Sequence, residues 1–327
     1  MELNQGMHLL DPLSPDLIHE STREGFGKAL LELGNINKNV VVLTADLAES
    51  VRAHYFAKKY PERFFQCGVA EQNMACVSSG LAYEGKIPFM TSFGIFSPGR
   101  NWEQIRTAIC YGEANVKIVS SHTGVTVGED GATHQALEDI AIMRSLPKMR
   151  IFVPCDYEQT KKAVFEAAKI EGPVYIRCGR EKMPVFTTEK TPFEPGKISV
   201  YKDGDDVTIF ACGSMVHESL LAADILEREG ISAAVLNVYD LVEIDQSCIE
   251  KYAKKCSLFV TVEEHQIKGG LGSAICEVAS EIQPVRVKRI GMRMEFGETG
   301  RGLELLKHFG LCFENIVRTV KEELKRK

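Results

Sequence analysis

The sequence predicts two tandem three-layer α/β domains with mostly parallel sheets. Three observations lead to this prediction. Amphipathic helical segments alternate with short apolar strands through almost all of the 327 residues. The strands are rich in β-branched residues without polar alternation, which is typical of parallel strands covered on both faces. Between Arg180 and Lys197 the periodicity is lost and three prolines occur, which indicates a linker between two domains.

The first domain is predicted from repeated helix and strand segments. Phe26, Leu30 and Leu33 lie on one face of an opening helix, and Gly34 is expected to end it. Asp156, just after a proline, is expected to open a later helix. Other helices are predicted over residues 51–59 and 69–82, and strands over 40–44, 64–66, 87–91, 116–120, 151–153 and 174–177.

The second domain repeats this pattern after the linker. Strands are predicted over residues 207–211, 233–237, 258–262 and 285–290, with helices between them and a last helix over 314–323. A glycine-rich segment at 268–273 lacks the full G-x-G-x-x-G pattern, which favours close helix packing over dinucleotide binding. The resulting division is a first domain over 1–185, a linker over 186–200 and a second domain over 201–327.

Composition excludes several classes of protein. Lys and Arg number 39 and Asp and Glu number 45, so the formal net charge of −6 argues against nucleic-acid binding. The longest apolar runs, of about five residues, are too short to span a membrane. The first residues lack the features of a signal peptide. None of the ten cysteines forms a C-x-x-C pair, so we expect reduced thiols in a cytoplasmic protein.

Four polar segments follow predicted strands, and ligands of such sheets bind outside the carboxyl ends of the strands. The segment at residues 122–134 holds three glycines, two acids and two histidines, too polar a set for a core. A flexible surface loop is the alternative, but histidine and aspartate together at a strand end favour a functional site. The other three candidate segments are residues 44–50, 67–74 and 91–100.

Three motifs in this order carry a family resemblance: Ala-Asp-Leu-Ala-Glu-Ser at 45–50, Gly-Val-Ala-Glu-Gln-Asn at 68–73 and Gly-Glu-Asp-Gly-Ala-Thr-His-Gln at 128–135. With them, the chain resembles the carboxy-terminal half of a transketolase. Transketolases are thiamine diphosphate enzymes that move two-carbon ketol units between sugar phosphates. The resemblance implies that the first domain is a pyrimidine-binding domain and the second a transketolase C-terminal domain.

The resemblance also implies a set of cofactor-binding residues. Glu71 matches the carboxyl group that hydrogen-bonds a pyrimidine nitrogen and favours the imino tautomer that acts as a base. Without the motif, Glu71 could equally be an acid that opens a helix. Phe93 and Phe96 match an aromatic pocket for the pyrimidine ring, although a third aromatic position falls at about Gly99. Asp46 matches a position near the cofactor.

A second implied set binds the substrate. Asp130 would hydrogen-bond sugar hydroxyls, and His134 would exchange a proton with a substrate oxygen, so both are catalytic candidates beside Glu71. Phosphate groups need cations and hydrogen-bond donors. The matching positions for the phosphate are Arg23, Ser50, His122 and Arg180.

The metal motif of thiamine diphosphate enzymes, Gly-Asp-Gly with a downstream Asn, is not found in the sequence. The nearest string, at 203–206, reads Asp-Gly-Asp-Asp. We therefore expect no metal ligand in this chain, with Mg²⁺ or Ca²⁺ bound mainly by an N-terminal transketolase subunit. The resemblance implies an α2β2 heterotetramer that acts on sugar phosphates only when both subunits are present.

Three other interpretations remain open. The β subunit of a 2-oxo acid dehydrogenase shares the domain order and a glutamate at Glu71, but it generally has a different histidine-rich loop. Half of a deoxyxylulose-phosphate synthase shares the Ala-Glu-Gln and Thr-His-Gln elements. The third motif favours transketolase over the dehydrogenase, and the first and third motifs favour it over the synthase. A non-catalytic scaffold or regulatory subunit would not need Glu71, Asp130 and His134 together.

Overall fold

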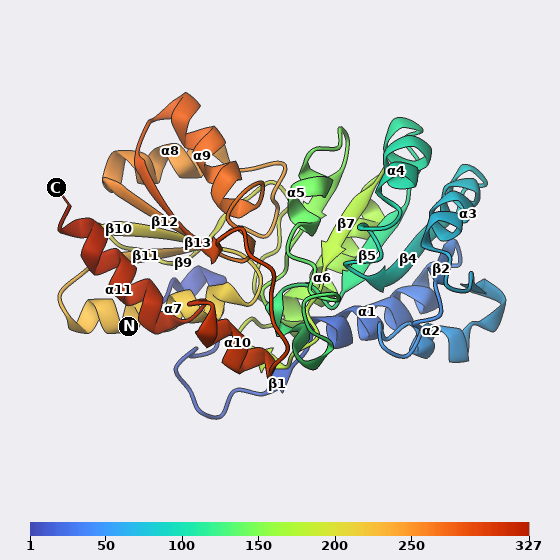
Figure 1. Cartoon of the computed structure of the whole chain (residues 1–327), viewed down its shortest axis with the longest axis horizontal. Helices are drawn as coiled ribbons and strands as arrows, with labels where there is room; N and C mark the ends of the chain where they lie inside the picture. Colours follow the sequence, from blue (N-terminus) through green and yellow to red (C-terminus); the bar gives the residue numbers. More distant parts are fainter. Residues whose placement is uncertain (327) are drawn as a thin grey trace.

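The computed structural model of the chain describes residues 1–326. Its first domain is a six-stranded sheet between two layers of helices (Figure 1). The strands are β2 (Val40–Thr44), β3 (Phe64–Gln66), β4 (Ile87–Phe93), β5 (Lys117–Ser121), β6 (Arg150–Phe152) and β7 (Val174–Arg177). They lie in the order β3-β2-β4-β5-β7-β6, and every neighbouring pair is parallel. The predicted parallel α/β sheet is confirmed.

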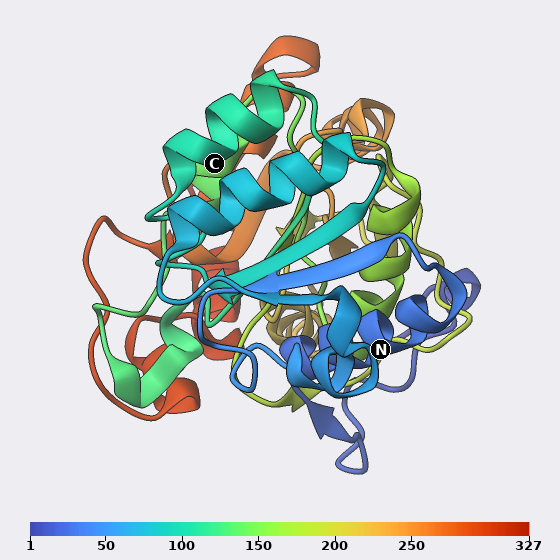
Figure 2. The ribbon, with the colours of Figure 1, turned by 90° about the vertical axis from the view of Figure 1, so that its right-hand side faces the viewer.

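The helices of the first domain cover both faces of this sheet. Helices α1 (Thr22–Ile36) and α6 (Tyr157–Lys169) pack together on one face. Helix α3 (Glu71–Tyr83), with α4 (Trp102–Gln104) and the π-helical turn η3 (Ile105–Tyr111), covers the other, as Figure 2 shows. The remaining elements are α2 (His54–Lys59), η2 (Pro61–Arg63), η4 (Val125–Asp130) and α5 (Asp139–Arg144).

The expected end of the first helix at Gly34 is wrong, because α1 continues to Ile36. Gly34 serves packing instead. A Cβ there would lie 2.6 Å from the Phe56 ring and 2.7 Å from the Tyr60 ring, so glycine lets α2 approach α1. The expected opening of a helix at Asp156 is confirmed, since its carboxylate accepts a hydrogen bond from the Gln159 amide at 2.9 Å.

The second domain is a five-stranded sheet with one antiparallel edge. Its strands are β9 (Ser199–Lys202), β10 (Val207–Ala211), β11 (Ala233–Asn237), β12 (Leu258–Gln266) and β13 (Arg286–Met292). Their order is β13-β12-β10-β11-β9, and only β9 runs antiparallel to its neighbour. Strand β9 begins within the stretch expected to be linker, where the sequence predicts no strand.

The helices of the second domain are α7 (Met215–Arg228), α8 (Gln246–Lys255), α9 (Leu271–Ile282), α10 (Gly302–His308) and α11 (Phe313–Leu324). Helices α7 and α11 cover one face of the sheet, while α8 and α9 cover the other. The glycine-rich segment opens α9 by close packing, as expected. Buried Glu263 accepts hydrogen bonds from the amides of Leu271 at 2.7 Å and Gly272 at 2.8 Å, and burial raises its pKa to about 7.

The amino-terminal segment lies against the second domain before the chain enters the first. The Asn4 amide donates to the Tyr201 carbonyl at 2.9 Å, and the Asn4 side chain donates to the Val200 carbonyl at 2.9 Å. Strand β1 (His19–Glu20) then pairs antiparallel with β8 (Met183–Pro184). The short turn η1 (Gln5–Met7) completes the segment. No helix within the described part of the chain has both the length and the apolar character needed to cross a membrane.

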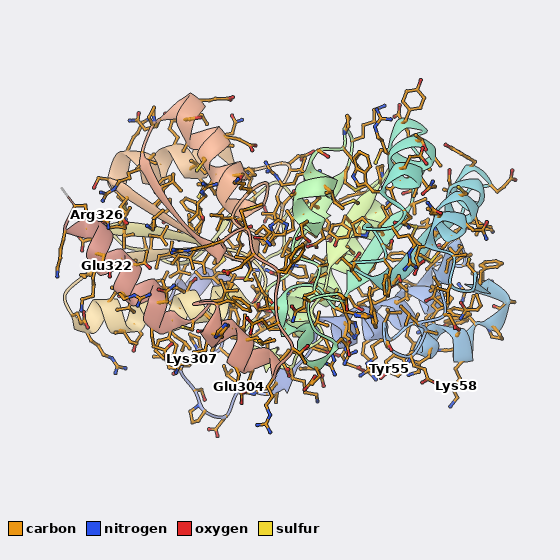
Figure 3. All side chains as sticks on the ribbon, viewed as in Figure 1. Tyr55, Lys58, Glu304, Lys307, Glu322 and Arg326 are labelled. Atoms are coloured by element: carbon orange, nitrogen blue, oxygen red, sulfur yellow. The ribbon has the colours of Figure 1, made fainter. Side chains whose placement is uncertain are left out.

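Three buried apolar clusters hold the layers together. One contains Phe26 and lies between the first sheet and α1 and α6, and another contains Leu220 and packs α7 and α11 on the second sheet. The third includes Met74 and Leu271 and crosses from the first domain to α8 and α9, so the two domains share a core. Charged side chains at the surface project outward in Figure 3, among them Lys58, Glu304, Lys307 and Glu322.

Candidate active site

Most of the residues predicted for the site lie at the carboxyl edge of the first sheet. Asp46 follows β2, Phe93 ends β4 and His122 follows β5. Glu71 is the first residue of α3, shortly after β3. Because these strands are parallel neighbours, residues far apart in the sequence meet at one edge.

Glu71 is a buried carboxylate that the free chain holds in an ion pair. Its side chain is only 1% exposed, and Oε2 lies 2.5 Å from Nη1 of Arg100. Ser92 Oγ donates to Oε1 at a long 3.4 Å, and the Asn101 amide donates to the Glu71 carbonyl at 3.1 Å. Arg100 is 45% exposed, so this cation can leave the carboxylate without breaking a core contact.

An aromatic group surrounds the approach to Glu71. The Phe93 ring stacks on His122 at 3.7 Å between centroids and on Phe96 at 5.9 Å. His134 meets the Phe96 ring edge-on at 5.5 Å. The Arg100 guanidinium lies over Phe96 at 4.6 Å. The structure therefore brings together both predicted phenylalanines and both predicted histidines.

Hydrogen bonds define the tautomer of His122. Arg23 Nη1 donates to His122 Nε2 at 3.3 Å and to the Ser50 carbonyl at 3.0 Å. An arginine nitrogen can only donate, so Nε2 is an acceptor and the ring proton sits on Nδ1, which contacts Ser121 Oγ at 2.8 Å. Burial, with added repulsion from Arg23 and Arg180, lowers the pKa of His122 to about 3. His122 is therefore neutral and orients Arg23.

Arg23, Arg52 and Arg180 form a cluster of cations, named here the cation cluster, in which Arg23 retains a hydrogen-bond donor that is unpaired within the described residues. Burial, followed by repulsion from Arg52 and Arg180, lowers the pKa of Arg23 to about 10. Its Nε is buried without a hydrogen-bond partner among residues 1–326. Arg52 pairs with Glu24 at 2.8 Å and Arg180 with Glu129 at 2.7 Å, which leaves Arg23 without a carboxylate within ion-pair distance in that range. This arrangement suits an anion such as a phosphate.

The remaining predicted residues lie at the rim. Asp46 is exposed and has a left-handed φ of 61°, fixed by its amide, which donates to Gln66 Oε1 at 2.7 Å. Asp130 is exposed at the end of η4, next to Glu129. His134 is half-buried, and its Nδ1 lies 3.0 Å from Thr133 Oγ1. Both acids are thus free of strong contacts within residues 1–326 and open to a ligand.

Sequence reasoning missed three residues of this region. Arg100 follows a Pro-Gly pair in the candidate segment 91–100, and a positive charge next to predicted pocket phenylalanines is the signal that could have found it. Arg52 lies two residues after Ser50, with no pattern that marks it. Glu264, in the second domain, accepts hydrogen bonds from Thr126, 138 residues earlier in the sequence. No local pattern could reveal that contact.

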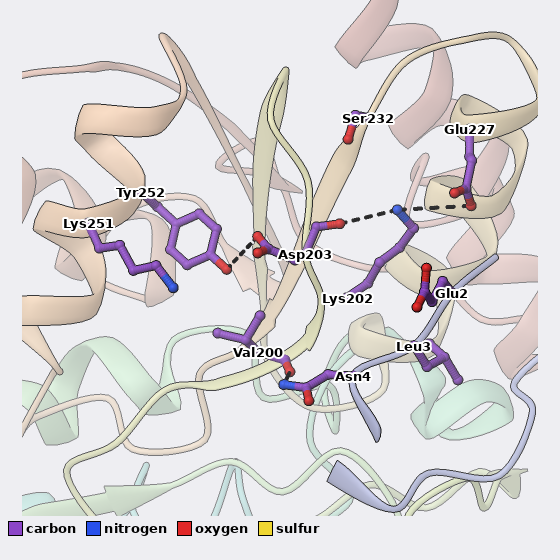
Figure 4. Close-up of a pocket in the computed structure, with 10 residues that line it drawn as sticks. All are labelled: Glu2, Leu3, Asn4, Val200, Lys202, Asp203, Glu227, Ser232, Lys251 and Tyr252. Carbon is purple, nitrogen blue, oxygen red and sulfur yellow. Dashed lines mark hydrogen bonds and ion pairs between the residues drawn. The ribbon is translucent and has the colours of Figure 1, made fainter. Parts of the chain in front are cut away.

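A cavity of about 580 Å³ lies elsewhere, with walls from residues 2–4 and 200–252 (Figure 4). Four of its polar side chains form two pairs. Tyr252 Oη donates to Asp203 at 2.9 Å, and Lys202 Nζ lies 4.0 Å from a Glu227 carboxylate oxygen. We therefore place the candidate site at the edge of the first sheet. Among residues 1–326 no group of three or more His, Cys, Asp and Glu side chains is arranged to hold a metal ion.

Comparisons with known proteins relate both domains of the chain to one family. A family model for the transketolase pyrimidine binding domain matches residues 19–185, and one for the transketolase C-terminal domain matches residues 196–316. The chain belongs to the transketolase family. The transketolase pyrimidine domain thus contains the whole aromatic and cationic site described above.

Individual transketolase relatives match almost end to end. A protein of Methanocaldococcus jannaschii, provisionally named as a transketolase C-terminal section, is 46% identical over 94% of this chain and 98% of its own length. The 6-deoxy-6-sulfo-D-fructose transketolase subunit SqwH of a Clostridium species is 39% identical over 97% of this chain and 98% of its own length. A solved structure described as a split gene transketolase, inactive beta4 tetramer, matches with a TM-score of 0.87. It is 47% identical and covers 93% of this chain and 98% of its own.

Longer transketolase relatives contain this chain as one half. Transketolase-like protein 2 of Mus musculus is 37% identical over 92% of this chain but only 48% of its own length. The chain is therefore a subunit of the split transketolase type, equivalent to the pyrimidine-binding and C-terminal domains.

Proposed function

We propose that this chain is the C-terminal subunit of a two-chain transketolase. It transfers two-carbon ketol units from a ketose phosphate to an aldose phosphate with thiamine diphosphate, and it acts only with an N-terminal partner subunit. The observation that carries the proposal is the buried Glu71 carboxylate beside an aromatic group and a cation cluster. Its domains are 1–185 and 201–327, joined by 186–200.

The residues at the sheet edge fit the pyrimidine half of thiamine diphosphate. When bound, this cofactor supplies the carbon nucleophile and the electron sink for ketol transfer. Glu71 would hydrogen-bond a ring nitrogen, since its carboxylate is only 1% exposed and a hydrogen bond shielded from water is strong. Phe93 and Phe96 would pack against the flat ring, and Asp46 lies at the rim beside it.

The cation cluster fits the substrate phosphate. Arg23 and Arg180 would bind phosphate oxygens, while Ser50 and neutral His122 hold the Arg23 guanidinium in place. Asp130, exposed at the end of η4, would accept hydrogen bonds from sugar hydroxyls. His134, packed edge-on against Phe96, would exchange a proton with the substrate oxygen near the carbon–carbon bond that forms or breaks.

The partner would complete the cofactor site. Mg²⁺ or Ca²⁺ and the diphosphate would be bound mainly by the N-terminal transketolase subunit, in an α2β2 heterotetramer in the cytoplasm. The names of the relatives, a C-terminal section and a subunit, support a second chain. Exposed apolar side chains just before α3, at the end of α3 and at the end of η3 offer an interface: Val69 is 72% exposed, Tyr83 60% and Tyr111 88%.

Substitution of Glu71 tests the proposal. In the complex with the partner, Glu71→Ala should abolish ketol transfer from xylulose 5-phosphate to ribose 5-phosphate while the chain still folds. Glu84→Ala is the matched control, because Glu84 is an exposed acid at the other end of the same helix. Unchanged turnover with Glu71→Ala would favour a non-catalytic subunit instead.

A further inference from the structure

The loop of residues 122–135, named here the substrate loop, carries His122, Asp130 and His134. It leaves the first sheet after β5 and closes on itself through the Gly124 amide, which donates to the Ala136 carbonyl at 2.9 Å. Between these ends the loop contains only the short turn η4. Within the first domain, Gln135 of the loop itself donates to the Val125 carbonyl at 3.1 Å and Arg180 donates to the Val127 carbonyl. The middle of the loop is also held from outside the first domain.

A side chain of the second domain does so. Glu264 lies on β12, and its Oε1 accepts hydrogen bonds from both the amide and the hydroxyl of Thr126, each at 2.8 Å. Its Oε2 accepts from Ser214 Oγ at 3.0 Å. The carboxylate therefore links the middle of the substrate loop to the start of α7.

The loop is shaped for this contact. Gly124 has a left-handed φ of 81°, and a Cβ at this position would lie 2.1 Å from Glu264 Oε1. Only glycine permits that approach. The three partners of Glu264 all act as donors, which suits a carboxylate and would leave buried donors unsatisfied if it were removed.

We infer that Glu264 is a positioning residue, through which the second domain holds the substrate loop in its catalytic geometry. The inference rests on the proposed function, since it assumes that Asp130 and His134 act on the substrate. It gives the second domain a role in the reaction beyond packing.

Simple adhesion between the domains is the competing explanation, and other groups already provide it. Arg177 at the end of β7 pairs with Asp139 at 2.8 Å and donates to the Glu264 carbonyl at 2.9 Å. The ion pair fixes Arg177 within the first domain, and its bond to the Glu264 carbonyl joins the two domains without the Glu264 carboxylate. The shared apolar core also joins them. Loss of that carboxylate should therefore act on the loop more than on the domain contact.

Three variants test the inference. Glu264→Ala removes the anchor. Glu264→Gln keeps it, since the amide oxygen still accepts from Thr126 and the amide nitrogen can donate to Ser214. Glu263→Ala is the matched control, because Glu263 is also buried on the same strand but its carboxylate contacts the Leu271 and Gly272 amides and His265 rather than the substrate loop. Amide hydrogen exchange over residues 124–131 is measured on each variant, and the kinetics on each complex with the partner.

Glu264→Ala should speed exchange over residues 124–131 and raise the KM for the aldose phosphate about 10- to 100-fold, because misplaced contact groups lose much of their effect. The Kd for thiamine diphosphate should stay unchanged. Glu264→Gln should restore both values, and Glu263→Ala should change neither, although it lowers the Tm.

Equal exchange over residues 124–131 in Glu264→Ala and Glu263→Ala would overturn the inference. If Glu264→Ala does not fold, Thr126→Val removes one donor and should still speed exchange locally; no local change would again overturn it. A wild-type complex without ketol transfer would instead refute the proposed function, and the exchange data would still decide whether Glu264 anchors the loop.

Discussion

Arg23→Gln separates the contribution of the cation cluster to binding from its contribution to stability. The substitution removes a guanidinium that burial and two neighbouring arginines make unfavourable, as its lowered pKa of about 10 indicates. It also removes the donor to Ser50 and His122. We expect opposite effects: a large loss of substrate binding with little loss of stability.

The magnitudes follow from the contacts. A hydrogen bond to a charged group contributes about 1.5–3 kcal/mol, so losing the phosphate contact should raise the KM for sugar phosphates about 10- to 150-fold. Each of the two lost internal hydrogen bonds costs about 0.5–1.5 kcal/mol, but relief of desolvation and repulsion offsets this. The free energy of unfolding of the free chain should therefore change by less than about 1 kcal/mol.

Steady-state kinetics of the complex and urea denaturation of the chain measure the two effects. Arg63→Gln is the matched control, since Arg63 donates to the carbonyls of Asn37 at 3.1 Å and Gly34 at 3.0 Å, away from the cation cluster. It should lower the free energy of unfolding without changing KM. Equal KM values for the two variants would refute the reasoning.

Three further predictions follow from other contacts. Arg100→Gln should tighten thiamine diphosphate binding by up to about fivefold in calorimetry, because the ring no longer competes with a half-exposed cation for Glu71; weaker binding would assign Arg100 to the cofactor. Asp139→Ala should lower the free energy of unfolding by about 3–5 kcal/mol in urea denaturation, since it leaves the Arg177 charge buried and unpaired; a loss similar to that of a surface variant would contradict this. The lowered pKa of His122 means that the unfolded chain binds a proton below about pH 6.5 that the folded chain does not, so stability should fall with decreasing pH by up to about 1.4 kcal/mol per pH unit from this residue. Between pH 6.5 and 4, the free energy of unfolding of His122→Gln should therefore depend less steeply on pH than that of the wild type. Identical slopes for the two proteins would contradict the assignment.

Helices and strands were predictable where a local sequence pattern has a single structural meaning. The apolar β-branched run of β2 gave its correct bounds, Val40–Thr44, because a strand covered on both faces needs no polar alternation. The end predicted at Gly34 was wrong because glycine occurs both at helix ends and at close packing contacts. The Phe56 and Tyr60 rings against Gly34, which come from distant residues, show that packing applies here. The edge strand β9 was missed because its sequence, Ser-Val-Tyr-Lys, resembles the polar stretch before it.

The site was predictable as a list of residues but not as a set of contacts. The family resemblance pointed to Arg23, His122 and Glu71, and the structure places Arg23 against His122. The Glu71–Arg100 pair and the Glu264–Thr126 contact depend on how distant segments fold together. Such contacts leave no spacing pattern in a single sequence.

The assay that most directly tests the central claim is ketol transfer from xylulose 5-phosphate to ribose 5-phosphate, with thiamine diphosphate and magnesium. It compares the chain alone, the N-terminal partner alone and the two mixed. We expect activity only in the mixture, because the diphosphate and metal site would lie on the partner. Turnover by this chain alone, or none in a mixture that forms a complex, would contradict the account.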